Sequence, residues 1–454
     1  MTPNRLISAL ALGALIGCGN PLDVTPKGSI PEATAITDAK SAEAALTGAY
    51  AGLQDLSYYG EDFPVMGDLS SDNTEHTGSY TSLAEADANQ LRADNETVAD
   101  IWIAIYDDIN RVNEIIAKVP GIESIDATEK SEILGEAYFL RALDYHNLVK
   151  LWGGVPLRLV PATSVSDAGS ITRATSDEVY AQILKDLDSA AAGITATEPT
   201  TRATVGAVHA LRARVLFYKG DYAGAEAEAR AVEDMSYELA PNYGDLFSTT
   251  GQSTPEDIFR VLFTAQQYNN LSYYYIYDNR WEVAPTKELM HQYDPAFDAS
   301  ASPTTWAPPA DGDARALWNI DHSGRHQFGN KYRSVQGTEY LHVIRFGEVV
   351  LIRAEALARL NQLPEAVAEV NRIRERANLP DLVLGVDVTT QDDVINEIIH
   401  QRRLELAFEG DRWPDLVRAG IATTVLGISQ NQTLYPIPQR EIDVTAGLTQ
   451  NPGY

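Results

Sequence analysis

The chain has one cysteine, Cys18, among its 454 residues. A single cysteine cannot form a disulfide within the chain, so the fold must be stable without one. Long apolar runs are also lacking. After the N-terminal segment, no stretch has the roughly 18 consecutive apolar residues that a membrane-spanning helix needs. These two absences exclude a disulfide-rich scaffold and a body embedded in a membrane by its own helices.

Basic residues are scarce relative to acidic ones. The chain has 35 Lys and Arg against 64 Asp and Glu, which gives a formal net charge of −29. Nucleic acid binding depends on Lys and Arg that neutralise phosphates, so we expect no nucleic acid partner. Direct attraction to anionic lipid is excluded for the same reason. The charge suits a neutral or cationic ligand but identifies none.

Sequence motifs of catalytic and metal sites are missing as well. The eight histidines form no His-Glu-x-x-His pattern, and the chain has no Gly-x-Ser-x-Gly segment or phosphate-binding glycine loop. Asp311, Asp313 and Asp321 could hold calcium in principle, but their spacing is not that of a calcium loop. We therefore expect no catalytic residue, no cofactor and no metal site.

The N-terminus has the pattern of a secretory signal. One arginine precedes the apolar stretch Leu6 to Ile16, which is too short to span a bilayer. The segment Leu15-Ile16-Gly17-Cys18 is similar to a bacterial lipobox, in which the cysteine is lipidated and becomes the mature N-terminus. We predict a signal peptide over residues 1–17 and a lipid-anchored tether over 18–30. The alternative is an ordinary secretory signal with an incidental cysteine.

Helical periodicity dominates most of the remaining chain. The expected helices cover residues 38–56, 97–118, 128–151, a helix capped by Ser176, 204–219 and 221–233. Two segments resemble tetratricopeptide units, residues 210–225 with a break at Gly220-Asp221, and residues 352–366. Strands should be limited to small hairpins. The sequence thus predicts a mainly α fold, a tetratricopeptide-like helical-repeat scaffold with long irregular segments.

Two stretches lack this periodicity, residues 58–95 and 242–340. The second is rich in aromatic residues, which argues against disorder and favours a functional role. Its tyrosines and tryptophans are Tyr268, Tyr273, Tyr274, Tyr275, Tyr277, Trp281, Trp306 and Trp318. Trp102, Trp152 and Trp413 lie in amphipathic helices and are expected to pack in the core.

Four segments resemble one family. They are residues 140–157 (LRALDYHNLVKLWGGVPL), 401–418 (QRRLELAFEGDRWPDLVR), 434–442 (LYPIPQREI) and 450–454 (QNPGY). They look like the SusD/RagB family of outer-membrane nutrient-uptake lipoproteins, in the expected order and with the lipobox. The resemblance implies a single body over residues 31–454, built from helices over about 38–235, a ligand-surface segment over about 242–340 and C-terminal helices over about 341–454.

The resemblance also implies a biological role. Such proteins carry four tetratricopeptide-like helix pairs, are not enzymes, and sit over a SusC-like TonB-dependent outer-membrane transporter. They help capture oligosaccharides or peptides for import, so we expect a lipid-anchored protein on the outer face of the outer membrane. Only one acid, Asp23, follows Cys18 closely, whereas many members have several there to promote surface display.

Six residues are the candidate ligand contacts. Aromatic faces stack on the C–H faces of sugar rings, and Asp, Asn and Arg bond hydroxyl groups, so a glycan site needs both kinds of side chain. The candidates are Asp72, Asn73, Arg280, Trp281, Trp306 and Trp318. A peptide ligand would use the same loops. A protein-interaction scaffold without a nutrient ligand is the second alternative.

Charged residues crowd the segment 401–418. Glu405, Glu409 and Asp411 could form a glycosidase-like acid pair, which would make the protein a lipid-anchored hydrolase. Their spacing from Arg402, Arg403 and Arg412 favours ion pairs along one helix, which join the scaffold to the C-terminal tail. We therefore expect this cluster to be structural.

Overall fold

The computed structural model describes residues 35–162, 172–247, 249, 252–276, 280–298, 309, 311–321 and 326–454. The predicted signal peptide, the lipidation site Cys18 and the tether lie outside the described residues, and so does Trp306. Among the described residues, no helix is both long and apolar enough to cross a membrane.

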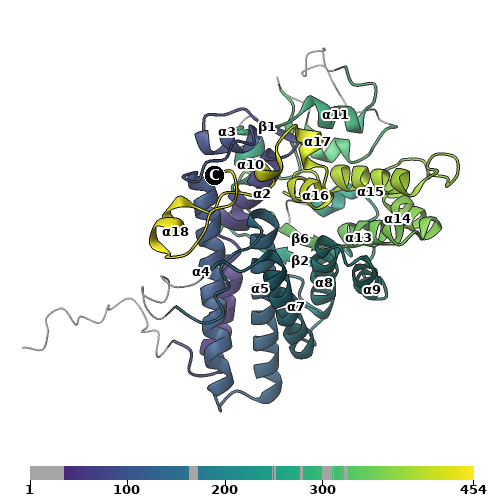
Figure 1. Ribbon diagram of the computed structural model, residues 1–454. Coiled ribbons are helices and arrows are strands. Elements are labelled where there is room, and N and C mark those ends of the chain that lie inside the picture. Colours follow the sequence, from purple (N-terminus) through teal and green to yellow (C-terminus); the bar gives the residue numbers. More distant parts are fainter. Residues whose placement is uncertain are drawn as a thin grey trace, which may run out of the picture.

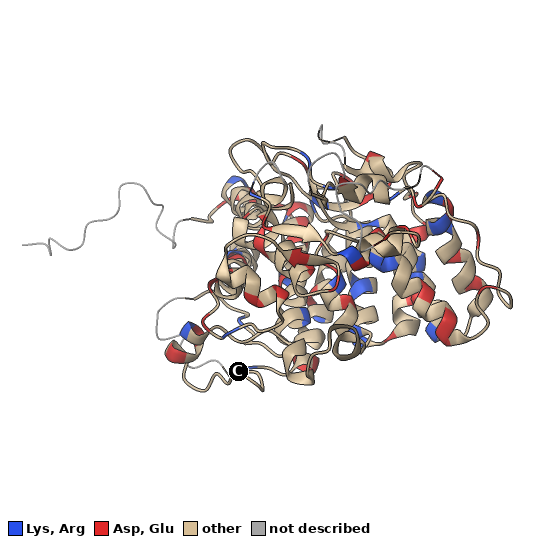
Figure 2. Cartoon of the chain, turned by 90° about the horizontal axis from the view of Figure 1, so that it is seen from above, with Lys and Arg blue, Asp and Glu red and all other residues tan. Residues whose placement is uncertain are grey.

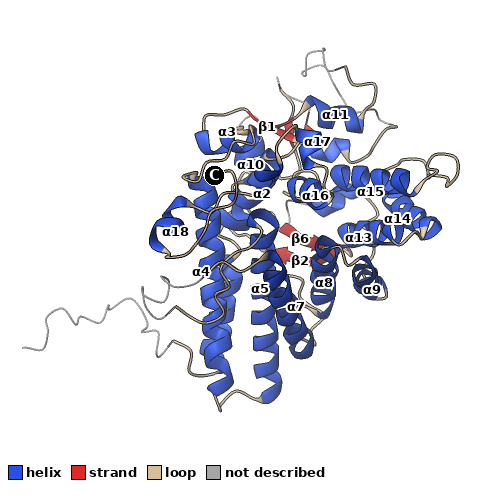
Figure 3. Cartoon of the chain, in the orientation of Figure 1, coloured by secondary structure: helices blue, strands red, loops and turns tan. Residues whose placement is uncertain are grey.

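The fold is mainly helical, as the sequence predicts (Figures 1 and 3). The longer helices are α1 (Ala39–Gly52), α4 (Glu96–Lys118), α5 (Ala127–Trp152), α7 (Ser176–Gly193), α8 (Val205–Lys219), α9 (Tyr222–Glu233), α13 (Phe346–Arg359), α14 (Leu363–Arg376) and α15 (Gln391–Glu405). The shorter helices are α2 (Asp62–Leu69), α3 (Thr81–Asp87), α10 (Leu271–Tyr275), α11 (Lys287–Tyr293), α12 (Ala316–Asn319), α16 (Arg412–Arg418), α17 (Ala422–Leu426) and α18 (Gln439–Val444).

Local signals in the sequence fix several helix ends. Gly220 ends α8 in the left-handed conformation at φ 81°, where glycine has no Cβ to clash. Asp221 then caps α9 by accepting from the Gly224 backbone N–H. The expected cap at Ser176 is wrong. Thr175 is the cap of α7, because its extended backbone lets its hydroxyl accept from the Glu178 N–H while the Glu178 carboxylate accepts from the Thr175 N–H.

The longer helices pack side by side in one row. Helix α4 packs on α5, α5 on α7, α7 on α8, and α8 on α9. The row then continues from α9 directly to α13, α14 and α15, although the whole central segment separates α9 from α13 in the sequence. Small residues at the centre of α9, Ala225 and Ala229, are fully buried and allow close approach. This arrangement is that of stacked helical repeats.

Strands form three two-stranded antiparallel sheets among the described residues. They are β1 (Thr74–His76) with β3 (Val283–Pro285), β2 (Asp257–Val261) with β6 (Leu341–Arg345), and β4 (Ile320–Asp321) with β5 (Phe328–Gly329). The expectation of small hairpins is wrong for the first two sheets, because their strands come from distant parts of the chain. Long-range pairing of this kind ties the irregular segments to the helical scaffold.

The stretch 58–95 is more regular than expected. It contains α2 and α3, and four apolar side chains of α2 are buried: Phe63, Val65, Met66 and Leu69. A tertiary contact holds α2, since Gly67 lies so close to the backbone of Gly410 that a Cβ atom would overlap it. Gly410 itself has a φ of 77°, which favours glycine.

The tryptophans expected in the core are there. Trp102 and Trp152 pack edge to face with ring centroids 5.3 Å apart, and Trp413 is 1% exposed. The indole N–H of Trp152 donates to the Pro436 carbonyl at 2.9 Å. The Tyr435 N–H donates to the Leu151 carbonyl at 2.8 Å, and the Asn451 amide donates to the Trp152 carbonyl at 3.0 Å. The C-terminal tail is therefore held against α5 by aromatic packing and several buried hydrogen bonds.

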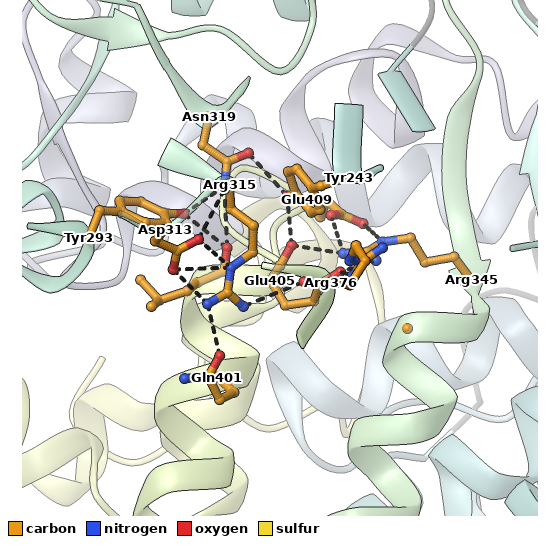
Figure 4. Close-up of polar contacts among 12 residues, drawn as sticks. Tyr243, Tyr293, Asp313, Arg315, Asn319, Arg345, Arg376, Gln401, Glu405 and Glu409 are labelled. Atoms are coloured by element: carbon orange, nitrogen blue, oxygen red, sulfur yellow. Dashed lines mark hydrogen bonds and ion pairs between the residues drawn. The ribbon is translucent and has the colours of Figure 1, made fainter. Parts of the chain in front are cut away.

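The charged cluster around Glu405 is structural, as predicted, but its partners differ from those expected (Figure 4). Glu405 forms ion pairs with Arg345 at 2.6 Å and with Arg315 and Arg376. Glu409 pairs with Arg345 at 2.9 Å and with Lys331 at 2.8 Å. Except for Arg376 at the end of α14, these cations come from the central segment and β6, not from the C-terminal tail. Figure 2 shows such mixing of acidic and basic residues along the chain.

The cations keep these carboxylates charged inside the protein. Burial alone would raise the pKa of Glu409, but Arg345 and Lys331 lower it to about 2. Burial likewise opposes ionisation of Glu405, and the three arginines around it hold its pKa well below its usual range. An acid with so low a pKa cannot hold a proton at neutral pH, so this pair is unsuited to general acid catalysis.

A second buried acidic pair behaves in the opposite way. Asp108 of α4 and Asp144 of α5 are fully buried and interact with each other, and one carboxylate oxygen of each has no hydrogen-bond partner. Burial raises the pKa of both, and their mutual repulsion adds to this for Asp144. Tyr58 donates to Asp144 at 2.9 Å, and Arg111 lies 3.4 Å from Asp108.

Because of this pair, we expect the free energy of unfolding to fall as pH rises. An acid whose pKa is raised by folding stabilises the protein fully below its unfolded pKa of about 4, and this contribution is lost as pH rises through the folded pKa. In D108N the amide donates to Asp144 without a titrating proton. We expect the unfolding free energy of D108N to fall less than that of the wild type between pH 5 and pH 8.5, by about 1–2 kcal/mol. Urea denaturation at both pH values measures this, and identical pH slopes would contradict it.

Candidate ligand-binding surface

Three tyrosines from two separate segments meet beside α3 and α10. Tyr80 directly precedes α3, and Tyr273 and Tyr274 lie in α10. The rings of Tyr80 and Tyr274 stack with centroids 6.1 Å apart, and Tyr273 meets Tyr274 edge to face at 5.8 Å. Tyr80 is 39% exposed and Tyr273 is 44% exposed, so both rings face solvent. Figure 1 shows α3, β1 and α10 together, at the end of the molecule opposite the turn between α4 and α5.

Arg280 covers one part of this cluster. Its guanidinium lies 4.3 Å from the centroid of the Tyr80 ring, in the geometry of a cation–π contact. The same group donates to Glu282 at 2.5 Å and to the Ser79 hydroxyl at 3.3 Å. Burial would raise the pKa of Glu282, but Arg280, His76 and backbone N–H groups hold it below its usual value. Arg280 is thus neutralised by a charged partner and contributes no net positive charge.

Pairing of β1 with β3 holds the surface together. His76 pairs with Val283 in the register of this sheet, and the Thr77 hydroxyl donates to the Trp281 carbonyl at 2.5 Å. Trp281 has a φ of 53°, an uncommon conformation for a bulky residue, and its ring lies 4.6 Å from that of His326. We call Tyr80, Tyr273, Tyr274, Arg280 and Trp281 the aromatic surface.

Asp72 and Asn73 lie behind this surface. The side chain of Asn73 is fully buried and accepts from Arg403 at 2.8 Å. Asp72 pairs with Arg412 at 2.7 Å and with Arg403 at 3.1 Å. Burial opposes the charge on Asp72, yet the two arginines lower its pKa. The backbone carbonyls of Asp72 and Asn73 accept hydrogen bonds from Thr286, next to β3, so both residues support the surface. The Asn73 side chain is buried and therefore inaccessible to a ligand.

Trp318 belongs to a different cluster. It packs against a small core of Ala240, Tyr243, Leu246 and Phe247. Gly244 approaches the Trp318 ring so closely that no Cβ would fit, and the guanidinium of Arg333 lies 4.4 Å from its ring centroid. These contacts occupy the ring, which explains its position without a ligand. Of the five candidates that lie in the described part of the chain, only Arg280 and Trp281 belong to the aromatic surface.

The sequence reasoning missed Tyr80 as a candidate. Tyr80 lies in the stretch 58–95, where the sequence predicts polar contacts, and its neighbours in space come from the other irregular stretch. Tyr273 and Tyr274 belong to the aromatic residues of that stretch but not to the six predicted contacts. The tyrosine run at residues 273–275 is the signal that could have found them, because α10 exposes Tyr273 while burying Tyr275.

The side chains of the aromatic surface are of the kinds that bind a ligand. Exposed tyrosine rings offer flat apolar faces, and the tyrosine hydroxyls and the arginine provide hydrogen-bond groups around them. No group of three His, Cys, Asp or Glu residues in the described part of the chain is placed to hold a metal ion. The fold and this surface together define a helical-repeat protein with an exposed aromatic surface.

Comparison with known proteins identifies the family. A family model described as "SusD family" matches residues 263–431, and one described as "Starch-binding associating with outer membrane" matches residues 22–217. A SusD-like protein of Formosa agariphila is 28% identical, over 98% of this chain and 97% of the relative. The starch-binding protein SusD of Bacteroides thetaiotaomicron is 24% identical over 78% of each chain.

Solved structures agree on the fold. A SusD superfamily protein from Bacteroides vulgatus superposes with a TM-score of 0.82 at 21% identity, covering 92% of this chain and 99% of the other. A laminarin-binding SusD-like protein superposes with a TM-score of 0.77 at 23% identity, covering 92% and 100%. Because the two family models together match most of the chain, it belongs to the SusD/RagB family, as the sequence motifs indicated.

Proposed function

We propose that this protein is a non-catalytic, surface-exposed lipoprotein that binds an oligosaccharide on the aromatic surface and delivers it to a SusC-like TonB-dependent transporter. The observation that carries this proposal is the exposed pair Tyr80 and Tyr273, held in place by Arg280 and the β1–β3 sheet. Such rings match the apolar faces of sugar units, and neutralisation of Arg280 by Glu282 favours an uncharged glycan.

The relatives support the ligand class and the location. One family model is described as starch-binding and as associating with the outer membrane, and one structural neighbour binds laminarin. Starch and laminarin are both neutral glucans, which agrees with the absence of net positive charge at Arg280. The transporter partner and the orientation towards the exterior rest on family membership.

Calorimetry against a panel of neutral and acidic glycans tests this function. We expect binding of at least one neutral glycan without release of reducing ends. Release of reducing ends would instead support the hydrolase alternative, and binding of peptides alone would support the peptide alternative. If no glycan or peptide binds while an outer-membrane barrel co-purifies, the protein is an interaction scaffold.

Lipidation at Cys18 leads to a separate prediction. Replacing Cys18 with Ser removes the thiol to which lipid attaches, and stable anchoring requires acyl chains that contribute about 0.8 kcal/mol per buried methylene. We expect C18S to move from the membrane fraction to the supernatant while its glycan affinity remains that of the wild type. Cell fractionation in a strain without the transporter measures this, because membrane retention of C18S there would rule out the lipobox.

A further inference from the structure

A cavity lies away from the elements that form the aromatic surface. It has a volume of about 480 Å³ and opens where the start of α8, the end of α9 and the segment entering β2 meet. The aromatic surface is built on α3, β1, β3 and α10, and the two share no residue. Binding cavities for small molecules have volumes of about 300–1,000 Å³, so this cavity is large enough for a ligand.

One wall of the cavity carries hydroxyl groups of fixed direction. Thr254 Oγ1 donates to Asp257 Oδ1 at 3.0 Å, and Ser253 Oγ donates to Asp257 Oδ2 at 3.2 Å. Asp257 also pairs with His342 at 2.8 Å and Arg260 at 3.1 Å, and these partners lower its pKa against the effect of burial. A charged carboxylate only accepts hydrogen bonds, so both hydroxyls must point their hydrogens at it. Arg260 Nη2 already donates to Ser253 Oγ at 3.4 Å, so the lone pairs of Thr254 Oγ1 are the ones left to accept from a ligand.

Tyr237 provides an aromatic wall. Its ring stacks on Phe346 at 6.5 Å with an interplanar angle of 26°, so it is held in one position. Gly206 in the first turn of α8 makes this possible, because a Cβ atom there would overlap the Tyr237 hydroxyl. The ring is only half-buried and lines the cavity. An apolar ring face is thus placed beside directed hydrogen-bond acceptors.

The remaining polar groups add acceptors and no cation. Glu198 is exposed at the cavity edge, and Thr197 and Ser236 are exposed beside it. The lining contains no Lys, Arg or His. A ligand that suits this cavity is therefore rich in hydrogen-bond donors, carries no negative charge, and has one apolar face for Tyr237. A neutral sugar unit has all three properties.

We propose that this cavity is a second binding site, which takes a short neutral saccharide independently of the aromatic surface. The site has its own aromatic wall and its own acceptors, so it does not depend on the proposed function of the aromatic surface. The bound sugar is either a free short oligosaccharide or the end of a longer glycan. A tetrasaccharide distinguishes the two sources. A site for free short sugars binds it alone, whereas a site for the end of a longer glycan requires the polymer.

Native mass spectrometry and calorimetry of the full chain with laminaritetraose and maltotetraose test the proposal. We expect the wild type to bind two equivalents of one of these sugars. T254V keeps the side-chain volume but removes the acceptor hydroxyl, and we expect it to weaken one of the two equivalents at least tenfold. Glu198 lies at the exposed edge of the cavity, so E198A cannot disturb the core. We expect E198A to weaken binding of the same equivalent at least threefold. Glucuronate should not bind in the cavity, because the lining offers it no cation.

The outcomes separate this proposal from the proposed function. The variant Y80A/Y273A should keep one equivalent, and that equivalent should be sensitive to T254V. A single equivalent that is sensitive to T254V and insensitive to Y80A/Y273A would support the cavity and overturn the aromatic surface. A single equivalent that is lost in Y80A/Y273A and unchanged in both T254V and E198A would overturn the cavity site. Two equivalents that appear only with polysaccharide would show that the cavity takes the end of a long glycan.

Discussion

The variant Y80A/Y273A is expected to bind its glycan at least about thirtyfold more weakly than the wild type, a loss of about 2 kcal/mol. Both rings are exposed, at 39% and 44%, and together they form the solvent-facing part of the aromatic surface. Removing them takes away the apolar faces on which a sugar ring can stack. Calorimetry with the glycan selected from the panel measures the change at the site of the proposed function.

The matched control is Y80F/Y273F. It keeps both rings and removes only the hydroxyl groups, so most of the affinity should remain if stacking is the main contribution. Neither variant should change the unfolding free energy by more than about 0.5 kcal/mol per residue, because both positions are at the surface. Wild-type affinity in Y80A/Y273A would show that the glycan binds elsewhere, and equal losses in both variants would assign the affinity to the hydroxyl groups.

The helical scaffold was predictable because its signals are local. Apolar residues at helical spacing, the break at Gly220-Asp221 and the small residues of α9 all act within a few residues of one another. The errors have the same origin. Ser176 and Thr175 are both suitable caps, and only the backbone conformation selects Thr175. Helix α2 is short, and its contact with Gly410 cannot be seen in its own sequence.

The binding surface was only partly predictable. The abundance of aromatic residues in the central segment indicated Trp281, and the need for hydrogen-bonding side chains indicated Arg280. Both lie in the aromatic surface, and their contact with a ligand stays a prediction. Tyr80 joins them only through the long-range pairing of β1 with β3, for which no sequence pattern exists. Asp72 looked like a solvated loop residue, but its partner Arg412 lies 340 residues further along the chain. Whether a polar loop residue faces solvent or a distant arginine is decided by tertiary structure.

Long-range ion pairs also make Arg345 important for stability. Its side chain is 1% exposed and joins three buried carboxylates, those of Glu256, Glu405 and Glu409. Figure 4 shows Arg345 beside Glu405 and Glu409. R345M keeps much of the apolar volume but leaves these acids without their shared cation. Breaking a buried ion pair by removing one partner costs about 3–5 kcal/mol, so we expect a loss of at least that size in the unfolding free energy.

Chemical denaturation followed by far-ultraviolet circular dichroism measures the effect of R345M, and R92M is the matched control. Arg92 pairs with Asp94 at the surface and is 65% exposed, so its loss should cost less than about 1 kcal/mol. At low pH the difference in unfolding free energy between R345M and the wild type should become smaller, because Glu409 has a folded pKa of about 2, below its unfolded value. The stabilisation from Glu409 is present above the unfolded pKa and is lost as pH falls through the folded pKa. Equal losses of unfolding free energy in R345M and R92M would mean that the buried ion pairs do not stabilise the packing of the central segment against α15.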